Sequence, residues 1–331
     1  MKISSKQLKL GFAYDNPIDE DSATESVSCE YEDSRTIDWI FGCLSNLGKT
    51  TKLSWGEDFV TRMIDARPDV IFNITEATKG RNRESLVPAI AESLGIPCTG
   101  TDALGLGLSL DKYLSKVIAS YEDIPTPPFL KIEKISDIDR RNDDVDKLGY
   151  PLFIKPVTGG SSQGIRHTSK VDSLPSLRTE IEWILNDCND SALVEKFISG
   201  REFCVGILEL GELQCLPVAE LRLDDGNPES FYSFDLKSTH QKEIICPAEI
   251  PSEISQTMKD YAMRIFRILG CRDFARIDFR LGLDGVPYFL EINPLPGLSP
   301  YYSIFTIQAE AGGIKPERII ETLVINALKR D

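Results

Sequence analysis

Histidine is almost absent from this sequence, and the cysteines are not spaced for metal binding. The 331 residues include two histidines, His167 and His240, and eight cysteines without a CxxC pair. These absences exclude imidazole-rich metal sites and argue against a zinc site or a disulfide framework. Scattered cysteines are typical of reduced, mostly buried thiols, so we predict a cytoplasmic protein.

Basic charge and long apolar segments are also lacking. The chain has 37 lysines and arginines against 52 aspartates and glutamates, a net charge of −15. Nucleic acids and anionic membranes bind basic surfaces, so we predict that neither is a partner. A small phosphate ligand is not excluded, because it needs only a few lysines. No apolar run is long enough to span a membrane, and MKISSKQLKLGFAY lacks the apolar segment of a signal peptide.

Strand-like and helix-like patterns alternate in the first part of the chain. Strands are predicted at residues 9–13 and 68–74, and helices at residues 34–47 and 84–94. This order predicts a small doubly wound α/β unit at the N-terminus. The length of the chain predicts two or three domains in total.

The rest of the chain also alternates strands and helices, but it carries neither a GxGxxG nor a GxxxxGK[ST] loop. Ser109 and Asp111 can cap a helix that runs to about Ser120. The predicted strands lie at residues 150–156, 193–198, 202–208, 276–281 and 286–293.

The last two of these strands predict a hairpin with a cation site. Asp284-Gly285 is a strong two-residue turn signal. That turn places Asp278 opposite Glu291 and Arg276 opposite Asn293, with all four side chains on one face. Directly opposed carboxylates repel, whereas a divalent cation between them reverses the sign. Oxygen ligands favour Mg²⁺ or Mn²⁺. A register slipped by one residue, or a solvated polar face, is the alternative.

A lysine and a glycine- and serine-rich loop predict a phosphate site. Lys155 ends a strand and is followed by TGGSSQGI (158–165). Such backbone can surround a polyphosphate, with the lysine as a point charge, although a flexible loop with a surface lysine is the alternative. Lys112 alone is typical of a solvated side chain. The same loop matches GxSxG at residues 160–164, but an extended segment follows in place of a helix, which disfavours a serine hydrolase.

Taken together, these segments resemble the ATP-grasp superfamily, and specifically the D-alanine–D-alanine ligases. The matching segments occur in family order over about residues 68–300. They are LGIPCTG (94–100), LDKYLSK (110–116), IPTPPF (124–129), YPLFIKPVTGGSSQGI (150–165), VEKFISGREF (194–203), FYSFDLKS (231–238) and RIDF…FLEINPLPGLSP (276–300).

The resemblance implies an α/β (α+β) ligase of three domains, with ATP held between the second and the third. The implied domains are an N-terminal α/β domain (1–103), a central ATP-grasp subdomain with the glycine-rich lid loop (104–192) and a C-terminal ATP-grasp subdomain with the metal site (193–331). The cofactors would be ATP and Mg²⁺ (or Mn²⁺). Family members are often homodimers, which makes a homodimer possible by analogy.

The resemblance also implies roles for individual residues of this sequence. Lys112 and Lys155 would contact the nucleotide phosphates under a lid that includes Gly160, Ser161 and Ser162. Glu195, Lys196 and Phe197 resemble the adenine hinge, and Glu202 the ribose-binding acid. Lys237 matches a mobile-loop lysine that reaches the terminal phosphate. Asp278, Glu291 and Asn293 match the metal ligands, and Arg276 the arginine that stabilises the developing negative charge.

The chemistry implied by these parts is amide formation. ATP would convert a carboxylate to an acyl phosphate, and an amine would then displace phosphate. The products would be ADP, phosphate and a dipeptide-like amide.

The substrate side departs from the family pattern, which predicts substrates other than two D-alanines. No glutamate of the first loop aligns with the one that faces the first amino acid in the family. Arg81 and Arg83 are additions that could receive an extra carboxylate; two solvated arginines are the alternative. Gly297 turns the chain towards the substrate pocket, where Tyr302 and Ser303 replace a serine–leucine pair. A strict D-alanine–D-alanine ligase, a depsipeptide ligase (suggested by His240) and an inactive ATP-binding paralogue are the alternatives.

Overall fold

The computed structural model of the protein describes residues 8–16, 31–77, 80–160, 163–223, 227–231 and 242–330. Ser161, Ser162 and Lys237, for which the sequence predicts roles, lie outside these ranges, as does His240.

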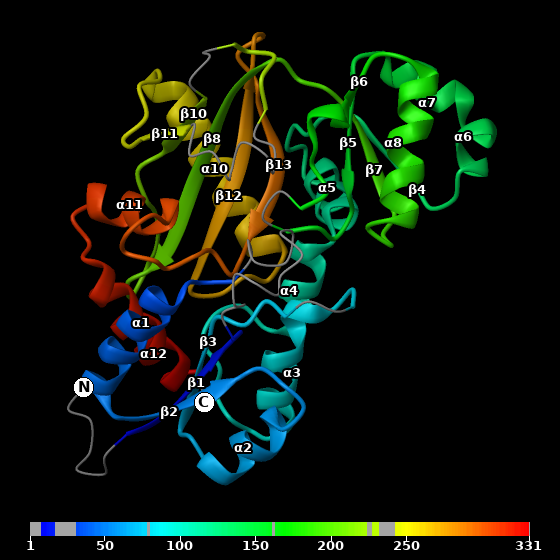
Figure 1. The fold of residues 1–331 in the computed structure, drawn as a ribbon. Coiled ribbons are helices and arrows are strands. Elements are labelled where there is room, and N and C mark those ends of the chain that lie inside the picture. The colour runs from blue at the N-terminus through cyan, green and yellow to red at the C-terminus, as the bar shows by residue number, and fades with distance from the viewer. Residues whose placement is uncertain are drawn as a thin grey trace.

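The N-terminal sheet has three parallel strands with helices packed on it (Figure 1). The strands, in sheet order, are β2 (Lys49–Ser54), β1 (Lys9–Tyr14) and β3 (Val70–Asn73). The helices are α1 (Ser34–Leu47), α2 (Phe59–Ala66), the 3₁₀-helix η1 (Arg83–Ser85) and α3 (Leu86–Ser93). Asp33 caps α1 by accepting a hydrogen bond from the Thr36 amide at 2.7 Å. The α/β unit predicted for this part of the chain is confirmed.

Strand β2 is an element that the sequence analysis did not predict. It pairs only with β1, so it forms one edge of the sheet. Its sequence is KTTKLS, in which Leu53 is the one buried residue. An edge strand that is exposed on most positions has neither an apolar run nor a clean alternation, and its pattern therefore resembles a loop.

The middle sheet is four-stranded and antiparallel. Its strands, in sheet order, are β4 (Phe129–Ile132), β7 (Ala192–Lys196), β5 (Leu152–Pro156) and β6 (Lys170–Val171). The helices of this region are α6 (Ser136–Arg140), α7 (Asn142–Leu148), η2 (His167–Ser169) and α8 (Leu174–Asn186). Leu177, Ile181 and Ile184 of α8 share a buried core with the sheet. The sheet continues through Lys196, past the domain boundary predicted at residue 192, and that boundary stays a prediction.

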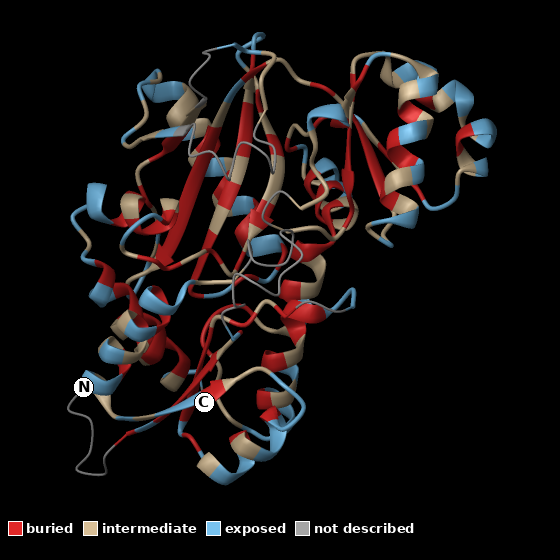
Figure 2. Ribbon diagram, in the orientation of Figure 1, coloured by how far each residue is buried: buried red, intermediate tan, exposed pale blue. Residues whose placement is uncertain are grey.

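The C-terminal sheet is the largest, and its strands are buried along much of their length (Figure 2). Its strands, in order, are β11 (Lys242–Ile245), β10 (Ala219–Leu223), β8 (Gly200–Glu209), β12 (Phe274–Gly282) and β13 (Pro287–Asn293), with β9 (Leu213–Cys215) also paired to β8. All pairs are antiparallel. Helix α10 (Ser252–Ile268) packs on this sheet through Met258, Ala262 and Phe266.

Two helical segments connect the sheets through shared cores. Helices α4 (Ala103–Leu110) and α5 (Lys112–Tyr121) precede the middle sheet in sequence, yet Ala119 belongs to the core of the C-terminal sheet. Helices α11 (Ile304–Ala311) and α12 (Pro316–Leu328) contribute Phe305 and Leu323 to one core with Phe12 of β1 and Ile40 of α1. The last helix therefore completes the N-terminal domain. None of the helices in the described ranges combines the length and apolarity needed to cross a membrane.

Candidate active site

A cavity of about 260 Å³ lies between the middle and C-terminal sheets, and most of the predicted site residues line it. Those that line it are Lys112, Lys155, Gly160, Glu195, Lys196, Phe197, Glu202, Arg276, Asp278, Glu291, Asn293 and Gly297. Arg81, Arg83, Tyr302 and Ser303 are described but do not line it. The cavity thus brings together the described residues predicted for the nucleotide and the metal, whereas Gly297 is the one residue predicted for the substrates that lines it.

The hairpin of β12 and β13 has the predicted register at the site, although the predicted turn is wrong. Arg276 lies opposite Asn293 and Asp278 opposite Glu291, as predicted. Near the turn, however, Gly282 donates its amide hydrogen bond to the Val286 carbonyl at 2.9 Å, which leaves a three-residue loop. The two-residue turn predicted for Asp284-Gly285 does not form.

A β-bulge restores the register between the turn and the site. Pairing shifts by one residue between Asp278 and Phe279, which leaves Leu290 as the extra residue of β13. Gly285 has φ of +79°, the left-handed conformation that three-residue hairpin loops need. The loop is one residue longer than predicted, and the bulge shifts the pairing back by one residue. Asp278 and Glu291 therefore face each other as predicted, because these two offsets cancel. Leu290, the extra residue of the bulge, lines the cavity.

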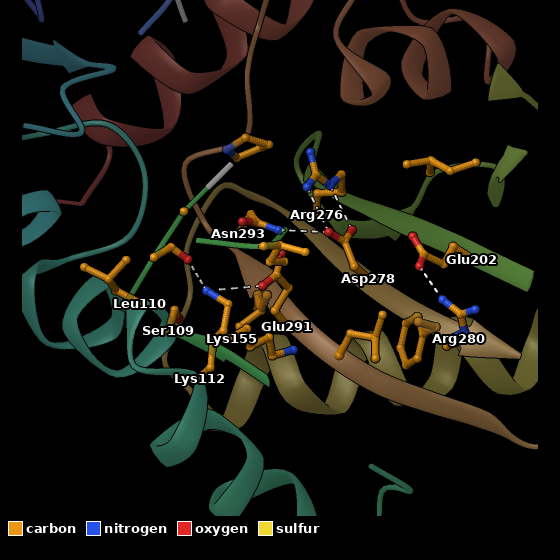
Figure 3. Close-up of a pocket in the computed structure, with 18 of the residues that line it drawn as sticks. Ser109, Leu110, Lys112, Lys155, Glu202, Arg276, Asp278, Arg280, Glu291 and Asn293 are labelled. Carbon is orange, nitrogen blue, oxygen red and sulfur yellow. Dashed lines mark hydrogen bonds and ion pairs between the residues drawn. The ribbon is translucent and has the colours of Figure 1, made fainter. Parts of the chain in front are cut away.

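Asp278 is held by two neighbours on the same face of the hairpin (Figure 3). The Arg276 guanidinium donates to both carboxylate oxygens, with Nε–Oδ1 and Nη2–Oδ2 distances of 2.8 Å. Asn293 Nδ2 donates to Oδ2 at 3.2 Å. Burial raises the pKa of Asp278 even though Arg276 opposes the shift. Burial thus favours the protonated form of Asp278, whereas the charge of Arg276 favours the ionised form.

Glu291 faces a lysine that the sequence analysis took for a solvated side chain. Lys112 is 6% exposed, and its Nζ lies 3.3 Å from Glu291 Oε2 while donating to the Gly159 carbonyl (Figure 3). The interpretation as a solvated lysine is wrong, because the Asp111 cap directs this first turn of α5 into the cavity. Burial opposes ionisation of Glu291, but Lys112, Lys155 and Arg276 lower its pKa to about 2. The carboxylate is thus ionised at neutral pH.

The chemistry of this donor set fits a divalent cation. Asp278, Glu291 and Asn293 offer two carboxylates and one amide oxygen, and a carboxylate bound by an arginine keeps further lone pairs for a metal ion. No cluster of three or more histidine, cysteine, aspartate or glutamate side chains suited to a metal occurs in the part of the chain that the structure describes. The site therefore suits a hard cation that completes its coordination with oxygens from a ligand or water.

Lys155 belongs to a buried trio of charges that includes Lys116, a residue missed by the sequence analysis. Glu195 Oε2 lies 2.9 Å from Lys155 Nζ, and Glu195 Oε1 lies 2.6 Å from Lys116 Nζ. Lys116 also donates to Thr126 Oγ1 at 2.8 Å and to the Phe289 carbonyl at 3.0 Å. The available signal was its position four residues after Lys112, which places both lysines on one helix face.

Glu195 is the carboxylate partner of both lysines, and this sharing shifts the pKa values of all three groups. Burial works against ionisation of Glu195, but the two lysines hold its pKa below the ordinary value. Burial also opposes the charge of Lys155, yet Glu195 and Glu291 raise its pKa. For Lys116, burial outweighs Glu195 and lowers the pKa to about 8. Both lysines are therefore charged at neutral pH, but only Lys155 keeps its charge well above pH 8.

The lowered pKa of Lys116 predicts a measurable pH dependence of stability. Between pH 8 and 10.5, Lys116 is neutral in the folded state but still protonated in the unfolded state. Stability rises with pH wherever the unfolded state binds more protons. Between pH 8 and 10.5, we expect the free energy of unfolding of wild type to rise by on the order of 2–3 kcal/mol relative to that of K116M. Denaturant unfolding of both proteins at several pH values measures the difference, and a flat difference would contradict burial of a titrating lysine.

The opposite end of the cavity is lined by aromatic rings. Phe153 and Phe197 line it, and Phe231 packs edge-on against Phe153 with ring centroids 4.9 Å apart. The Lys196 side chain, which also lines the cavity, is held by the backbone, because its Nζ donates to the Gly149 and Tyr150 carbonyls at 2.9 Å each. Flat apolar walls beside the phosphate-suited lysines fit a purine base.

Glu202 lies beside these rings and is paired with Arg280, a second residue missed by the sequence analysis. The Arg280 Nη1–Glu202 Oε1 distance is 2.6 Å (Figure 3). Burial raises the pKa of Glu202, and Arg280 opposes that shift.

Glu32, a third residue that the sequence analysis did not identify, binds the loop after β13 through two hydrogen bonds. Glu32 Oε1 accepts from the Leu298 amide at 2.9 Å, and Oε2 accepts from the Tyr302 hydroxyl at 2.8 Å. The sequence analysis found no glutamate of the first loop to align, yet Glu32 reaches the loop that contains Gly297. Ser303 is buried and accepts from the Ser299 amide at 3.0 Å. Tyr302 and Ser303 thus support this loop from behind the cavity wall.

The two arginines predicted for an extra carboxylate are engaged elsewhere. Arg81 binds Asp111 at 2.8 Å, and its side chain is 64% exposed. Arg83 is 7% exposed and donates to the Thr158 carbonyl at 2.9 Å. Arg83 therefore connects η1 to the loop after β5. The proposed binding of an extra carboxylate by Arg81 and Arg83 stays a prediction, and neither arginine lines the cavity.

The chain is similar to ligases of known sequence and structure. Residues 118–325 match the family model described as D-ala D-ala ligase C-terminus. D-alanine–D-alanine ligase A of Bacillus cereus is 30% identical over 268 residues, 81% of this chain and 84% of that protein. A D-alanine–D-alanine ligase of Bacillus anthracis complexed with ATP has a similar structure, with a TM-score of 0.76 and 24% identity over 97% of this chain and 98% of that one. VanG D-Ala:D-Ser ligase of Enterococcus faecalis matches with a TM-score of 0.75 and 22% identity over 97% and 100%. These similarities confirm the fold class predicted from the sequence.

Proposed function

The chain belongs to the D-alanine–D-alanine ligase family and is an ATP-dependent ligase, and from this premise we propose the roles of its residues in joining a carboxylate to an amine through an acyl phosphate. The observation that carries the proposal is the convergence of Lys112, Lys155, Arg276 and Glu291 in one cavity. Phosphoryl transfer requires cationic side chains that neutralise the phosphate oxygens and carboxylates that hold the metal ion, and the cavity offers both.

In the first step, an oxygen of the substrate carboxylate attacks the γ-phosphorus of ATP and the bond to ADP breaks. Lys112 and Lys155 neutralise the phosphate oxygens, and Glu195 fixes Lys155 in place. Asp278, Glu291 and Asn293 would hold Mg²⁺, which shields the charge on the transferred phosphoryl group when it is bound. The glycine-rich loop after Lys155, which includes Gly160, covers the phosphates.

In the second step, the amine nitrogen attacks the acyl carbon, the bond to the phosphate oxygen breaks, and phosphate leaves. The amine loses a proton as the amide forms. Arg276 stabilises the oxyanion of the tetrahedral intermediate, and its two hydrogen bonds to Asp278 preset its orientation. A preoriented donor needs no rearrangement when the charge develops.

We propose that the amine substrate is recognised by negative charge at the end of the cavity beyond Arg276. Glu76, Glu84 and Gly297 line the cavity together with the apolar residues Leu295 and Ile304. Carboxylates and a small apolar wall suit an amino acid with a compact side chain. Because Tyr302 and Ser303 stand where the family has a serine–leucine pair, at least one substrate is proposed to differ from D-alanine.

Product analysis over a substrate panel tests this function. Purified protein is incubated with ATP, Mg²⁺ and pairs of D- and L-amino acids or hydroxy acids, and ADP, phosphate and product masses are followed. ADP and phosphate with a mixed dipeptide are the expected result. D-alanyl-D-alanine from D-alanine alone would instead support a strict D-alanine–D-alanine ligase, and an ester product a depsipeptide ligase. AMP and pyrophosphate would contradict the acyl-phosphate route.

Replacing Glu32 by alanine is expected to impair one amino-acid substrate without affecting ATP. The change removes the acceptor of the Leu298 amide and of the Tyr302 hydroxyl, so the loop after Gly297 loses its support. We expect KM for that substrate to rise about tenfold, equivalent to about 1.4 kcal/mol, while KM for ATP stays constant. Asp38, an α1 carboxylate that binds Lys52 at 2.8 Å, provides the control variant D38N. An equal rise in all three KM values would contradict a role confined to the substrate loop.

A further inference from the structure

Arg280 is a buried cation in the cavity wall to which the mechanism gives no role. It follows Arg276 and Asp278 at intervals of two residues on β12, and the pairing of this strand with β8 is continuous. The three side chains therefore point to the same face of the sheet. Arg280 is 4% exposed and lines the cavity at its aromatic end.

The guanidinium connects the proposed ribose-binding acid to the wall at the base end. Nη1 donates to Glu202 Oε1 at 2.6 Å. Nη2 donates to the Pro228 carbonyl at 3.0 Å and to the Ser230 carbonyl at 2.7 Å. Phe231, the next residue, packs against Phe153. One side chain thus fixes both the carboxylate and the backbone that carries an aromatic ring of the base end.

Two further features connect Arg280 with a ligand. Its Nε is buried and has no hydrogen-bond partner among the described residues. Its guanidinium lies 4.9 Å from the ring centroid of Phe197, which lines the same end of the cavity. A buried donor without an acceptor destabilises the folded state, so an arginine is a poor choice for filling space alone.

We propose that Arg280 is a nucleotide-positioning residue, which holds Glu202 in the orientation that accepts a ribose hydroxyl and fixes the segment that ends in Phe231 against the base. The inference rests on the proposed function, because it presumes that the cavity binds ATP. Arg280 occupies Glu202 Oε1, so Oε2 is the oxygen offered to the ribose. Without Arg280, the buried Glu202 carboxylate would lose the guanidinium that is hydrogen-bonded to it, and Oε1 and Oε2 would no longer be held in a fixed orientation.

Nucleotide binding measured by calorimetry tests the proposal without knowledge of the amino-acid substrates. Full-length wild type, R280M, R280K, E202Q and the double variant R280M/E202Q are titrated with the Mg²⁺ complexes of ATP, 2′-deoxy-ATP and 3′-deoxy-ATP. We expect wild type to prefer ATP over at least one deoxy analogue by about tenfold. R280M is expected to bind ATP about 10- to 100-fold more weakly and to lose this preference.

The other variants separate positioning from folding. R280K is expected to retain part of the preference, and the double variant is expected to bind ATP no more weakly than the weaker single variant, since both changes remove the same ribose contact. Arg201 is a matched control on the same sheet, because it binds Glu220 through two hydrogen bonds of 2.8 and 2.6 Å and lies 4.9 Å from the Phe203 ring. R201M is expected to keep the nucleotide preference of wild type. Thermal unfolding of each variant identifies any loss of fold.

Several outcomes would overturn the inference. R280M with unchanged affinity and preference would do so, and so would equal weakening of ATP and both analogues, which would indicate a structural arginine. A wild type that binds all three nucleotides equally would remove the role of Glu202 and with it that of Arg280. No binding of ATP to wild type would overturn the proposed function as well, which distinguishes the two failures.

Discussion

Replacing Glu291 by glutamine is expected to lower kcat/KM for ligation by about 10²- to 10³-fold. Glutamine keeps the size of the side chain but removes the charge that faces Lys112 and the proposed Mg²⁺. We expect the fold to survive, because the neighbouring cations keep other partners: Lys112 keeps the Gly159 carbonyl, and Arg276 keeps Asp278. ADP release as a function of Mg²⁺ concentration measures the effect.

A second readout distinguishes loss of the cation from loss of a lysine contact. Mn²⁺ bound in the presence of ADP can be counted by electron paramagnetic resonance, and E291Q is expected to bind it more weakly than wild type. Asp284, which lies in the turn of the same hairpin and accepts from the Val286 amide at 3.0 Å, provides the control D284N. Wild-type Mn²⁺ binding by E291Q would remove Glu291 from the ligand set, whatever the loss of activity.

Glu195 is expected to be the most destabilising single position in the site. Changing it to glutamine removes the carboxylate that pairs with the buried Lys116 and Lys155 ammonium groups, and removal of one partner from a buried ion pair costs about 3–5 kcal/mol. At pH 7, K116M is expected to change the free energy of unfolding by less than about 1 kcal/mol, because it removes one of two cations and leaves a balanced pair. Denaturant unfolding of both variants measures the difference.

The double variant K116M/E195Q makes this prediction specific to charge. If the two lysines repel each other once Glu195 is neutral, removal of Lys116 recovers a large part of the loss. The control is E133Q, since Glu133 is an exposed carboxylate that binds Lys131 at 2.7 Å; it is expected to leave stability unchanged. A loss in the double variant equal to the sum of the single losses would show that packing, and not charge, determines the effect.

Local chemistry explains why much of the fold could be predicted from the sequence. The helical spacing of apolar residues predicted α1, and the short apolar run of β3 predicted a buried parallel strand. Strand β2 was missed because an exposed edge strand has no such pattern. The turn was predicted wrongly because Asp-Gly suits two-residue and three-residue loops alike, and the Gly282–Val286 hydrogen bond shows that the longer loop forms.

The site was predictable where a motif lies within one strand or one loop, and not where contacts join distant segments. Asp278 and Glu291 face each other across one hairpin, so their proximity follows from the register. Glu32 meets Leu298 across 266 positions of sequence, and no local pattern encodes that contact. Lys116 looks like a surface lysine until β7 and β13 bury it. Arg280 was overlooked because Arg276 and Asp278 already explained the polar face of β12.

The core shared by the first strand and the last helix has a consequence for synthesis of the chain. Phe12 and Ile40 pack with residues of α11 and α12, so the domain built on β1 lacks part of its interior until α12 has emerged from the ribosome. The core of the middle sheet, as far as the described residues show it, comes from residues 130–194. We therefore expect the middle of the chain to become protease-resistant on the ribosome before its beginning does. The order of maturation would then differ from the order of translation.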